Sequence, residues 1–302
     1  MTPAAVALLL LSAVTHAGWN LLGKREHPSA AFLLLANTLG CLCLLPALLL
    51  YGRALAAFPA RVWALLAATG LCQAGYYTAL AGAYRAGEMS VAYPLARSAP
   101  AILVPLLAGL LGQGEPLSAQ AMAGIALAVA GSFVLPMRRF VDYGPPGDAR
   151  RSIALALAAA LGTAGYSIVD DAALHLLRET PGMPVGHAPA TVVYAFLEGI
   201  ASSLWLALFV LASGRERASL RQAWPARLRR AALAGAGIYV TYTLVLLAMA
   251  FVTNVSYVVA FRQLSIPLGA LLGVLVLREP RPLPKFAGVA TMFAGLVLIG
   301  SG

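Results

Sequence analysis

Two arginines interrupt apolar stretches in which a permanent positive charge is costly. Arg97 lies in SVAYPLARSAPAILVP (90–105), and Arg262 lies in AFRQLSIPLG. A charged side chain deep in a bilayer costs roughly 2.5–3.5 kcal/mol on insertion scales, so it persists where it faces water, a partner or a ligand. Because a guanidinium group binds carboxylate or phosphonate oxygens through two parallel hydrogen bonds, the pair predicts an anion-binding site. The alternative is that each arginine pairs with a buried acid or caps backbone carbonyl groups.

Three carboxylates occur in similar surroundings and could carry a proton or balance a positive charge. Glu198 lies in the middle of TVVYAFLEGIASSLWL. A carboxylate at that depth needs a proton or a cation, so Glu198 is either a proton carrier or a structural partner of Arg97 or Arg262. Asp170 and Asp171 lie near the end of their apolar stretch. They are either solvated at the membrane interface or available to a substrate ammonium group or a coupling proton.

A polar stripe runs along the first apolar stretch of the chain. His16, Asn20 and Lys24 are spaced by four residues and therefore share one helix face, with Trp19 beside them. In lipid such a face points into the protein. A histidine titrates near neutrality, so His16 is a candidate carrier of a coupling proton. The alternatives are that His16 is a satisfied core residue and that Lys24 extends to the interface.

Aromatic and amide side chains complete the predicted binding site. Aromatic residues in membrane spans more often pack or anchor at the interface, and that alternative stays open for each tyrosine. The predicted substrate-binding residues are Arg97, Arg262, His16, Asn20, Trp19, Tyr77, Tyr93, Tyr166, Glu198, Tyr242, Tyr257 and Gln263. The proton-coupling candidates are Glu198, His16 and Asp170. We expect no catalytic residue, no metal and no cofactor.

The elements that must position these residues follow from the composition. The chain has 302 residues, of which 61% are hydrophobic and 11% are charged, whereas soluble domains carry about 25% charged residues. A span needs ~20 mainly apolar residues, and backbone groups in lipid must be paired internally, as in a helix. We therefore predict an all-α integral membrane protein with ten transmembrane helices, at 3–24, 30–51, 60–84, 90–113, 118–137, 151–176, 188–212, 229–252, 255–277 and 283–300.

The two halves of the chain resemble each other. Shifting residues 90–135 by 164 positions aligns them without a gap on 254–299, with identities at Tyr93/Tyr257, Gly109/Gly273, Glu115/Glu279 and Gly131/Gly295. We predict a first five-helix repeat at 1–137, a linker at 138–150 and a second five-helix repeat at 151–302.

An odd number of helices in each repeat inverts the second repeat in the membrane. Inverted repeats place a binding site near the bilayer midplane, where the halves meet. Arg97 and Arg262 each lie about eight residues into their spans, ~12 Å deep at 1.5 Å per residue. They therefore approach one depth from opposite sides. Prolines 94, 100, 105 and 267 predict kinks near the arginines, and the polar-poor segments 118–137 and 283–300 predict packing at the back of each half or in a dimer.

Two five-helix units, each closing with an acidic turn and a Gly-rich helix (GQGEPLSAQAMAG and LREPRPLPKFAG), resemble the EamA-type permeases of the drug/metabolite transporter superfamily. The opening HAGWNLLGK is similar to a subgroup associated with phosphonate utilisation. Together with the paired arginines, the resemblance leads us to expect a secondary transporter of a small anionic or zwitterionic metabolite (an amino acid, organic acid or phosphonate) that works by alternating access, with proton coupling or exchange. The alternatives are a membrane enzyme acting on a lipid-linked substrate, for which HExxH, DDxxD and GxSxG motifs are missing, and a channel or sensor.

Loop charges predict the orientation of the chain in the membrane. Sixteen lysines and arginines lie in loops after odd-numbered spans, and three lie after even-numbered spans: Arg53, Arg61 and Arg178. The positive-inside rule places the odd loops in the cytoplasm and both termini outside, whereas relatives of the family are usually drawn with both termini inside. We expect a multi-pass protein of a bacterial inner membrane, with a lipid bilayer and a small-molecule substrate as partners, no nucleic acid, and a homodimer as an open question.

Overall fold

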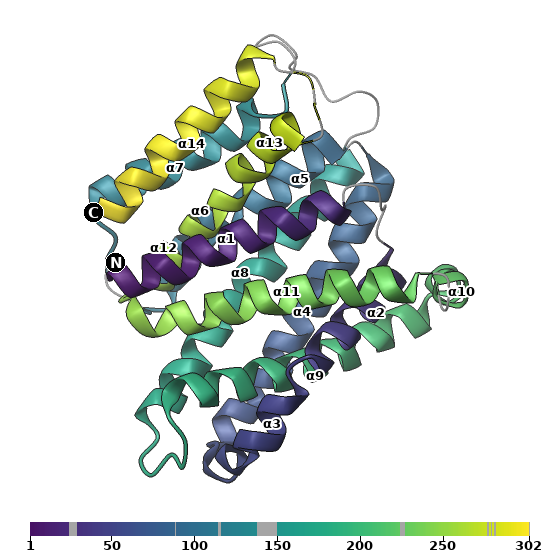
Figure 1. Cartoon of the computed structure of the whole chain (residues 1–302), viewed down its shortest axis with the longest axis vertical. Helices are drawn as coiled ribbons and strands as arrows, with labels where there is room; N and C mark the ends of the chain where they lie inside the picture. The colour runs from purple at the N-terminus through teal and green to yellow at the C-terminus, as the bar shows by residue number, and fades with distance from the viewer. Residues whose placement is uncertain are drawn as a thin grey trace.

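The structure is a computed structural model that describes residues 1–23, 29–87, 89–113, 116–137, 150–223, 227–276, 278, 280 and 282–301. These residues form helices and turns, without a strand among them (Figure 1). The α-helices are α1 (Pro3–Gly23), α2 (Ala30–Leu42), α3 (Leu45–Tyr51), α4 (Ala60–Ala86), α5 (Met89–Ser98), α6 (Pro100–Leu110), α7 (Ala119–Val134), α8 (Arg150–Glu179), α9 (His187–Ala212), α10 (Gly214–Ala223), α11 (Leu228–Ala248), α12 (Val255–Phe261), α13 (Ser265–Val276) and α14 (Leu283–Ser301). The 3-10 helices are η1 (Gly52–Ala57), η2 (Met249–Phe251) and η3 (Arg262–Leu264).

Each predicted membrane segment coincides with helical structure over most of its range. Seven segments of the described chain are long and apolar enough to cross a bilayer, and α1 and α7 contain shorter apolar stretches, Pro3–Gly18 and Ala119–Val134. The remaining predicted span, 60–84, lies within the 27 residues of α4. The chain is thus a multi-pass, all-helical membrane protein, and the total of ten spans stays a prediction.

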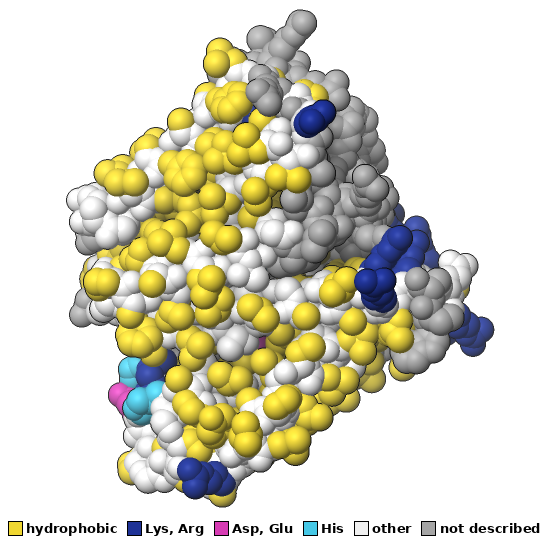
Figure 2. Space-filling model, viewed as in Figure 1, with side chains coloured by type: hydrophobic (Ala, Val, Ile, Leu, Met, Phe, Trp, Pro, Cys, Tyr) yellow, Lys and Arg dark blue, Asp and Glu magenta, His cyan; other side chains and the backbone are white. Residues whose placement is uncertain are grey.

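The outer surface of the bundle is apolar. Large side chains such as Leu49, Leu110, Leu204 and Leu275 are mostly exposed on different helices, and hydrophobic side chains cover much of the face shown in Figure 2. An apolar surface of this extent would be exceptional on a protein in water. In a bilayer, lipid chains cover such a surface, so it needs no protein partner. Lys and Arg gather instead at the end of the molecule where α10 lies (Figures 1 and 2).

The two helical segments that carry the predicted anion-binding arginines are both interrupted beside them. α5 ends at Ser98, and α6 begins at Pro100, whose nitrogen has no hydrogen to donate to the preceding turn. In the second half, α12 ends at Phe261 and the chain tightens into η3, which begins with Arg262. The helix is thus interrupted at Pro100, one of the prolines where a kink is predicted, whereas Pro267 lies inside α13 and not at the break. Such breaks leave backbone carbonyl groups without helical partners.

Packing partners are exchanged in a regular way between the two halves. α4 packs along α8 and α9, while its counterpart α11 packs along α1 and α2. In the same manner α5 contacts α8, and α13 contacts α1. The α2–α11 contact is very close, because a Cβ on Gly235 would lie 2.0 Å from the Ala36 carbonyl oxygen. These contacts surround the broken helices α5–α6 and α12–α13 with the polar faces of α1 and α8.

α7 and α14 lie side by side, far apart in sequence (Figure 1). A Cβ on Gly295 would lie 2.5 Å from the Gly124 carbonyl oxygen, and a Cβ on Gly131 would lie 2.8 Å from the Gly288 carbonyl oxygen. Small residues allow helix backbones to approach closely in lipid. α7 and α14 therefore pack on each other within one chain, and the dimer contact considered for them stays a prediction.

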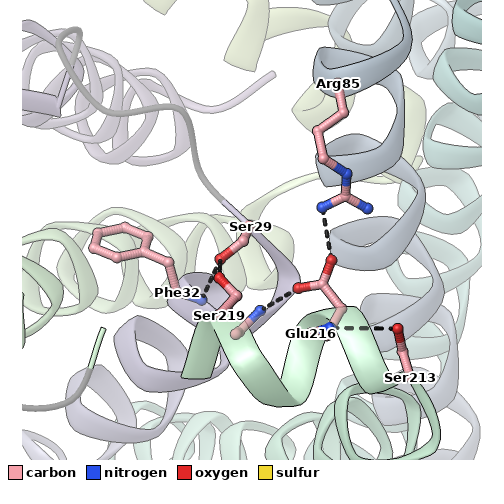
Figure 3. Close-up of polar contacts among 7 residues, drawn as sticks. Ser29, Phe32, Arg85, Ser213, Glu216 and Ser219 are labelled. Carbon is pink, nitrogen blue, oxygen red and sulfur yellow. Dashed lines mark hydrogen bonds and ion pairs between the residues drawn. The ribbon is translucent and has the colours of Figure 1, made fainter. Parts of the chain in front are cut away.

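A partly buried ion pair holds α10 against the bundle (Figure 3). Arg85 Nη1, near the end of α4, donates to Glu216 Oε1 at 2.7 Å, and the Ala31 backbone N–H donates to Glu216 Oε2 at 3.1 Å. Ser219 of α10 donates to Ser29 Oγ, which in turn accepts from the Phe32 N–H at the start of α2. Glu216 therefore satisfies a cation and one of the unpaired N–H groups of a helix N-terminus at once.

Candidate functional site

Arg97 and Arg262 line one small cavity at the junction of the broken helices. The other lining residues are Ala96, Pro100, Thr163, Val259 and Gln263, from α5, α6, α8, α12 and η3. The space open to the centre of a water molecule is about 10 Å³, which is room for roughly one water. The two segments that the sequence pairs by their arginines therefore meet at one place, which is closed to anything larger in this conformation.

Arg97 is held by polar contacts that cross between the halves. Its Nη2 donates to Ser265 Oγ at 3.1 Å, and Ser265 donates to the Arg262 carbonyl oxygen at 3.0 Å. The backbone carbonyl of Arg97 accepts from Gln263 Nε2 at 2.6 Å. The break between α5 and α6 thus leaves a carbonyl group that the amide of Gln263 satisfies.

Arg262 is held by aromatic side chains. Its Nη2 donates to Tyr166 OH at 3.4 Å, and its Cζ lies 5.3 Å from the centre of the Tyr242 ring. A guanidinium group over an aromatic face is attracted to it, more strongly when desolvated. The Tyr166 and Tyr242 rings pack edge to face with centroids 5.6 Å apart. Arg262 is therefore oriented without an acid in direct contact among the described residues.

Asp170 is joined to this arrangement through Tyr242, and two tyrosines bind it. Tyr194 OH donates to Asp170 Oδ1 at 2.7 Å, and Tyr242 OH donates to Oδ2 in a short hydrogen bond. The side chain is fully buried, so the interpretation of Asp170 as a solvated residue at the interface is wrong. Asp171, half-buried, interacts electrostatically with Arg178 and fits that interpretation better.

Glu198 is buried without a partner. Its exposed fraction is 0%, and neither carboxylate oxygen has a hydrogen-bond partner among the described residues. Asp170 and Arg262 interact with it only electrostatically. Within the described chain, neither Arg97 nor Arg262 forms an ion pair with an acid, so the direct structural pairing considered for Glu198 does not occur.

Three polar atoms of the cavity-lining residues lack hydrogen-bond partners in the described part of the chain. They are the donors Arg97 Nε and Arg262 Nη1 and the acceptor Gln263 Oε1. Buried polar atoms are nearly always satisfied, and an unsatisfied one costs about 1–3 kcal/mol, more when charged. The residues that carry these atoms line one cavity, so a ligand or water that enters there in a more open conformation could complete the hydrogen bonding.

The remaining predicted site residues lie at different distances from the cavity. His16, half-buried in α1, interacts electrostatically with both Arg97 and Arg262. Tyr77 is buried against Tyr76, with ring centroids 5.0 Å apart. Tyr93 and Tyr257 are half-buried and do not line the cavity. The side chains of Trp19 and Asn20 lie outside the described part of the structure, as do the residues Lys24, Glu115 and Glu279.

Sequence reasoning missed several polar contacts. Asn37 of α2 donates to Ser202 Oγ at 2.8 Å and Ser203 Oγ at 2.9 Å, and accepts from Tyr239 OH at 3.0 Å. The sequence feature that could have indicated Asn37 is its amide side chain within the mainly apolar run LLLANTLG. Ser265, three residues beyond Arg262, was also missed. Both are short polar side chains whose partners lie more than 150 residues away in the chain.

The described residues contain no group of three or more His, Cys, Asp or Glu side chains arranged to hold a metal ion. The three cysteines, Cys41, Cys43 and Cys72, are free thiols. The polar chemistry of the centre is therefore that of guanidinium, carboxyl, phenol and amide groups, which bind and orient charged molecules or move protons.

Comparison with known proteins relates the first part of the chain to a family. The sequence model described as the EamA-like transporter family matches residues 3–137. No curated protein is similar enough to match. Among solved structures, 27 chains match; one, titled "Crystal structure of protein", is 19% identical with a TM-score of 0.69 over 99% of this chain and 98% of that chain. At this identity the likeness shows a shared fold over nearly the whole chain. Residues 3–137 are therefore similar to the EamA-like transporter family, which is part of the drug/metabolite transporter superfamily.

Proposed function

We propose that this protein is a secondary transporter of a small anionic or zwitterionic metabolite, which binds between the two halves at Arg97 and Arg262. One observation carries the proposal: two half-buried arginines, neither paired with an acid among the described residues, line the same cavity and each retain a buried donor without a partner. Guanidinium groups in such a setting favour a carboxylate or phosphonate. Amino acids, organic acids and phosphonates are the candidate substrates.

Alternating access is the transport mechanism that we propose. The exchange of packing partners between α4–α8 and α11–α1 supports two inverted five-helix repeats. Helices broken at the proposed binding site are typical of such transporters. A cavity with room for roughly one water must open before a metabolite enters, which fits a conformation closed around the site. Rocking of the halves would expose the arginines to one side of the membrane at a time.

Glu198 is the group that we assign to proton coupling. Ionised carboxylates in an apolar interior are costly unless paired, and Glu198 has no hydrogen-bond donor among the described residues. A protonated Glu198 suits the closed conformation, and water reaching it in an open conformation would release the proton. His16, beside both arginines, and Asp170, bound by two tyrosines, are the second and third candidates.

We further propose that the protein resides in a bacterial inner membrane with the α10 end in the cytoplasm. The excess of arginine in the loops after odd-numbered spans supports this orientation. A cysteine introduced at the exposed Arg221 of α10 would then react with a membrane-impermeant maleimide only after the cells are opened. Labelling of this cysteine in intact cells would show that the orientation is the opposite one.

A thermal-shift measurement on the purified protein tests the binding proposal. The panel is 2-aminoethylphosphonate, L-alanine, L-glutamate and succinate at 10 mM, because a ligand at about 100 times its Kd stabilises the folded form by about 2.7 kcal/mol. We expect at least one member to raise the melting temperature of the wild type but not that of Arg262→Ala. No shift with any member, or an equal shift in the variant, would overturn the proposal. The same ligand should show counterflow in proteoliposomes, which an enzyme does not support.

A further inference from the structure

The amide of Gln263 is fixed in one orientation. Its Nε2 donates to the Arg97 carbonyl oxygen at 2.6 Å and lies 3.5 Å from the Val259 carbonyl oxygen. Both neighbours are acceptors, so an exchange of the amide nitrogen and oxygen would place oxygen against oxygen. The side chain is 3% exposed. Oε1 is therefore the amide atom left for another partner.

Oε1 of Gln263 has no donor among the described residues, although Gln263 lines the cavity. The unsatisfied atoms around the cavity thus have both characters: Arg97 Nε and Arg262 Nη1 need an acceptor, and Gln263 Oε1 needs a donor. Thr163, also in the lining, adds a hydroxyl oxygen from the opposite element α8. A ligand with only an anionic group would accept hydrogen bonds from the arginines and leave Gln263 Oε1 without a donor.

We infer that the substrate is a zwitterion whose ammonium group donates to Gln263 Oε1 while its anionic group binds the two arginines. The inference rests on the proposed function of the same cavity. An ammonium group has three donors and forms charge-assisted hydrogen bonds, about twice as strong as neutral ones. Neither Asp170 nor Glu198 lines the cavity, so Gln263 is the residue that determines the preference for an amine. Hydrogen bonds to charged groups contribute about 1.5–3 kcal/mol, and 1.4 kcal/mol corresponds to a tenfold change in Kd.

Three ligands that differ at one position test this inference. They are 2-aminoethylphosphonate, 2-hydroxyethylphosphonate and ethylphosphonate, each titrated against purified protein in detergent by isothermal titration calorimetry. For the wild type we expect 2-aminoethylphosphonate to bind at least about tenfold more tightly than ethylphosphonate, with the hydroxyl compound between them. Equal affinity for the amine and the ethyl compound, or tighter binding of the hydroxyl compound, would overturn the inference.

Two variants separate the acceptor from the rest of the Gln263 side chain. Gln263→Met keeps a similar volume and removes both amide groups, so the ratio of the two affinities should fall to about one. Gln263→Glu removes the Nε2 donor to Arg97 and keeps an acceptor, so the preference for the amine should persist. If Gln263→Met keeps the wild-type ratio, Gln263 does not bind the ammonium group.

The outcomes distinguish this inference from the proposed function. If all three phosphonates bind equally to the wild type and all lose affinity in Arg97→Ala, the anion site stands and the zwitterion is wrong. If no phosphonate binds the wild type and neither L-alanine nor L-glutamate binds it, both the proposed anion site and the zwitterionic substrate are wrong. If L-alanine alone binds, the same comparison is made with L-alanine and propionate, and equal affinities overturn the inference.

Discussion

Two glutamates buried in the same chain have opposite surroundings. Glu216 of α10, 6% exposed, accepts from Arg85 and from the Ala31 backbone N–H. Glu198 of α9, 0% exposed, accepts from no described residue. The arginines show the same contrast, since Arg85 has a carboxylate partner and Arg97 and Arg262 have none in the described chain. At the edge of the bundle opposite charges neutralise one another, whereas at its centre they are held apart.

The contrast indicates what each region does. A matched pair such as Arg85–Glu216 has no binding capacity left, so its contribution is to hold α10 against α2 and α4. Unpaired buried groups lower stability and persist where a function needs them. Tyrosines take the place of acids around Arg262, and tyrosine hydroxyls take the place of cations around Asp170. These surroundings fit the proposed function, in which the centre keeps its charged groups for a ligand and a proton.

Removing Arg262 should have the largest effect on transport and little effect on stability. Loss of two charge-assisted hydrogen bonds to an anion, each about 1.5–3 kcal/mol, should lower uptake of 2-aminoethylphosphonate by at least about 100-fold in Arg262→Ala. The folded state loses only a weak bond to Tyr166 and a ring contact. Uptake in proteoliposomes and melting in detergent are the measurements. If Arg262→Ala is strongly destabilised but its folded molecules take up substrate at the wild-type rate, the comparison is wrong.

Removing Glu216 should do the opposite. Glu216→Ala leaves the Arg85 guanidinium and the Ala31 N–H without their acceptor. Breaking a fully buried pair costs roughly 3–5 kcal/mol, and the 32% exposure of the Arg85 side chain lowers the expected loss to about 2–3 kcal/mol. Uptake per folded molecule should stay close to that of the wild type.

A double-mutant cycle with Arg85→Ala measures how far the Arg85–Glu216 contact itself is responsible. Additive losses of stability in the two single variants would show that the residues do not interact. A smaller loss in the double variant than their sum is the expected result.

Neutralising Glu198 should uncouple transport from the proton gradient without unfolding the protein. If one proton accompanies each substrate, a pH difference of one unit supports about tenfold accumulation by the wild type. Glu198→Gln should exchange substrate at a measurable rate but fail to accumulate it. Asp170→Asn serves as the comparison, because it disturbs two tyrosine hydrogen bonds and should also lower stability. Unchanged accumulation in Glu198→Gln would transfer the coupling role to another residue.

The smallest effect is expected from Tyr242→Phe. The variant keeps the ring beneath Arg262 and loses only the donor to Asp170, which Tyr194 still binds. We expect about 1 kcal/mol of lost stability and a modest loss of uptake. Tyr242→Leu removes the ring as well and should lower uptake further. Equal uptake by the Phe and Leu variants would show that the cation–π contact does not orient Arg262.

Much of the fold could be predicted because its signals are local. Apolar runs mark helices such as α9 within one residue of 188–212, and Pro100 marks the break beside Arg97. The predicted repeat aligns the segment that carries Arg97 with the segment that carries Arg262. Their meeting could therefore be predicted from the sequence. Their convergence on one cavity is the part of the candidate site that sequence alone could anticipate.

The contacts within the site could not be predicted, because they depend on how each helix is rotated about its axis. Two adjacent aspartates looked alike in the sequence, yet Asp170 is buried between two tyrosines and Asp171 is half-buried near Arg178. The Gln263 amide was recognised only as a neighbour of Arg262. Its hydrogen bond to the Arg97 carbonyl oxygen depends on two interruptions, one between α5 and α6 and one between α12 and α13. The α7–α14 contact likewise joins glycines whose partners are set by tertiary structure.

The most direct test of the account is counterflow of 2-aminoethylphosphonate in proteoliposomes of the double variant Arg97→Ala/Arg262→Ala, beside Arg85→Ala reconstituted at equal density. The account predicts background exchange in the double variant and exchange near the wild-type rate in folded Arg85→Ala. Exchange at the wild-type rate in the double variant would contradict the central claim that the two cavity arginines bind the transported anion.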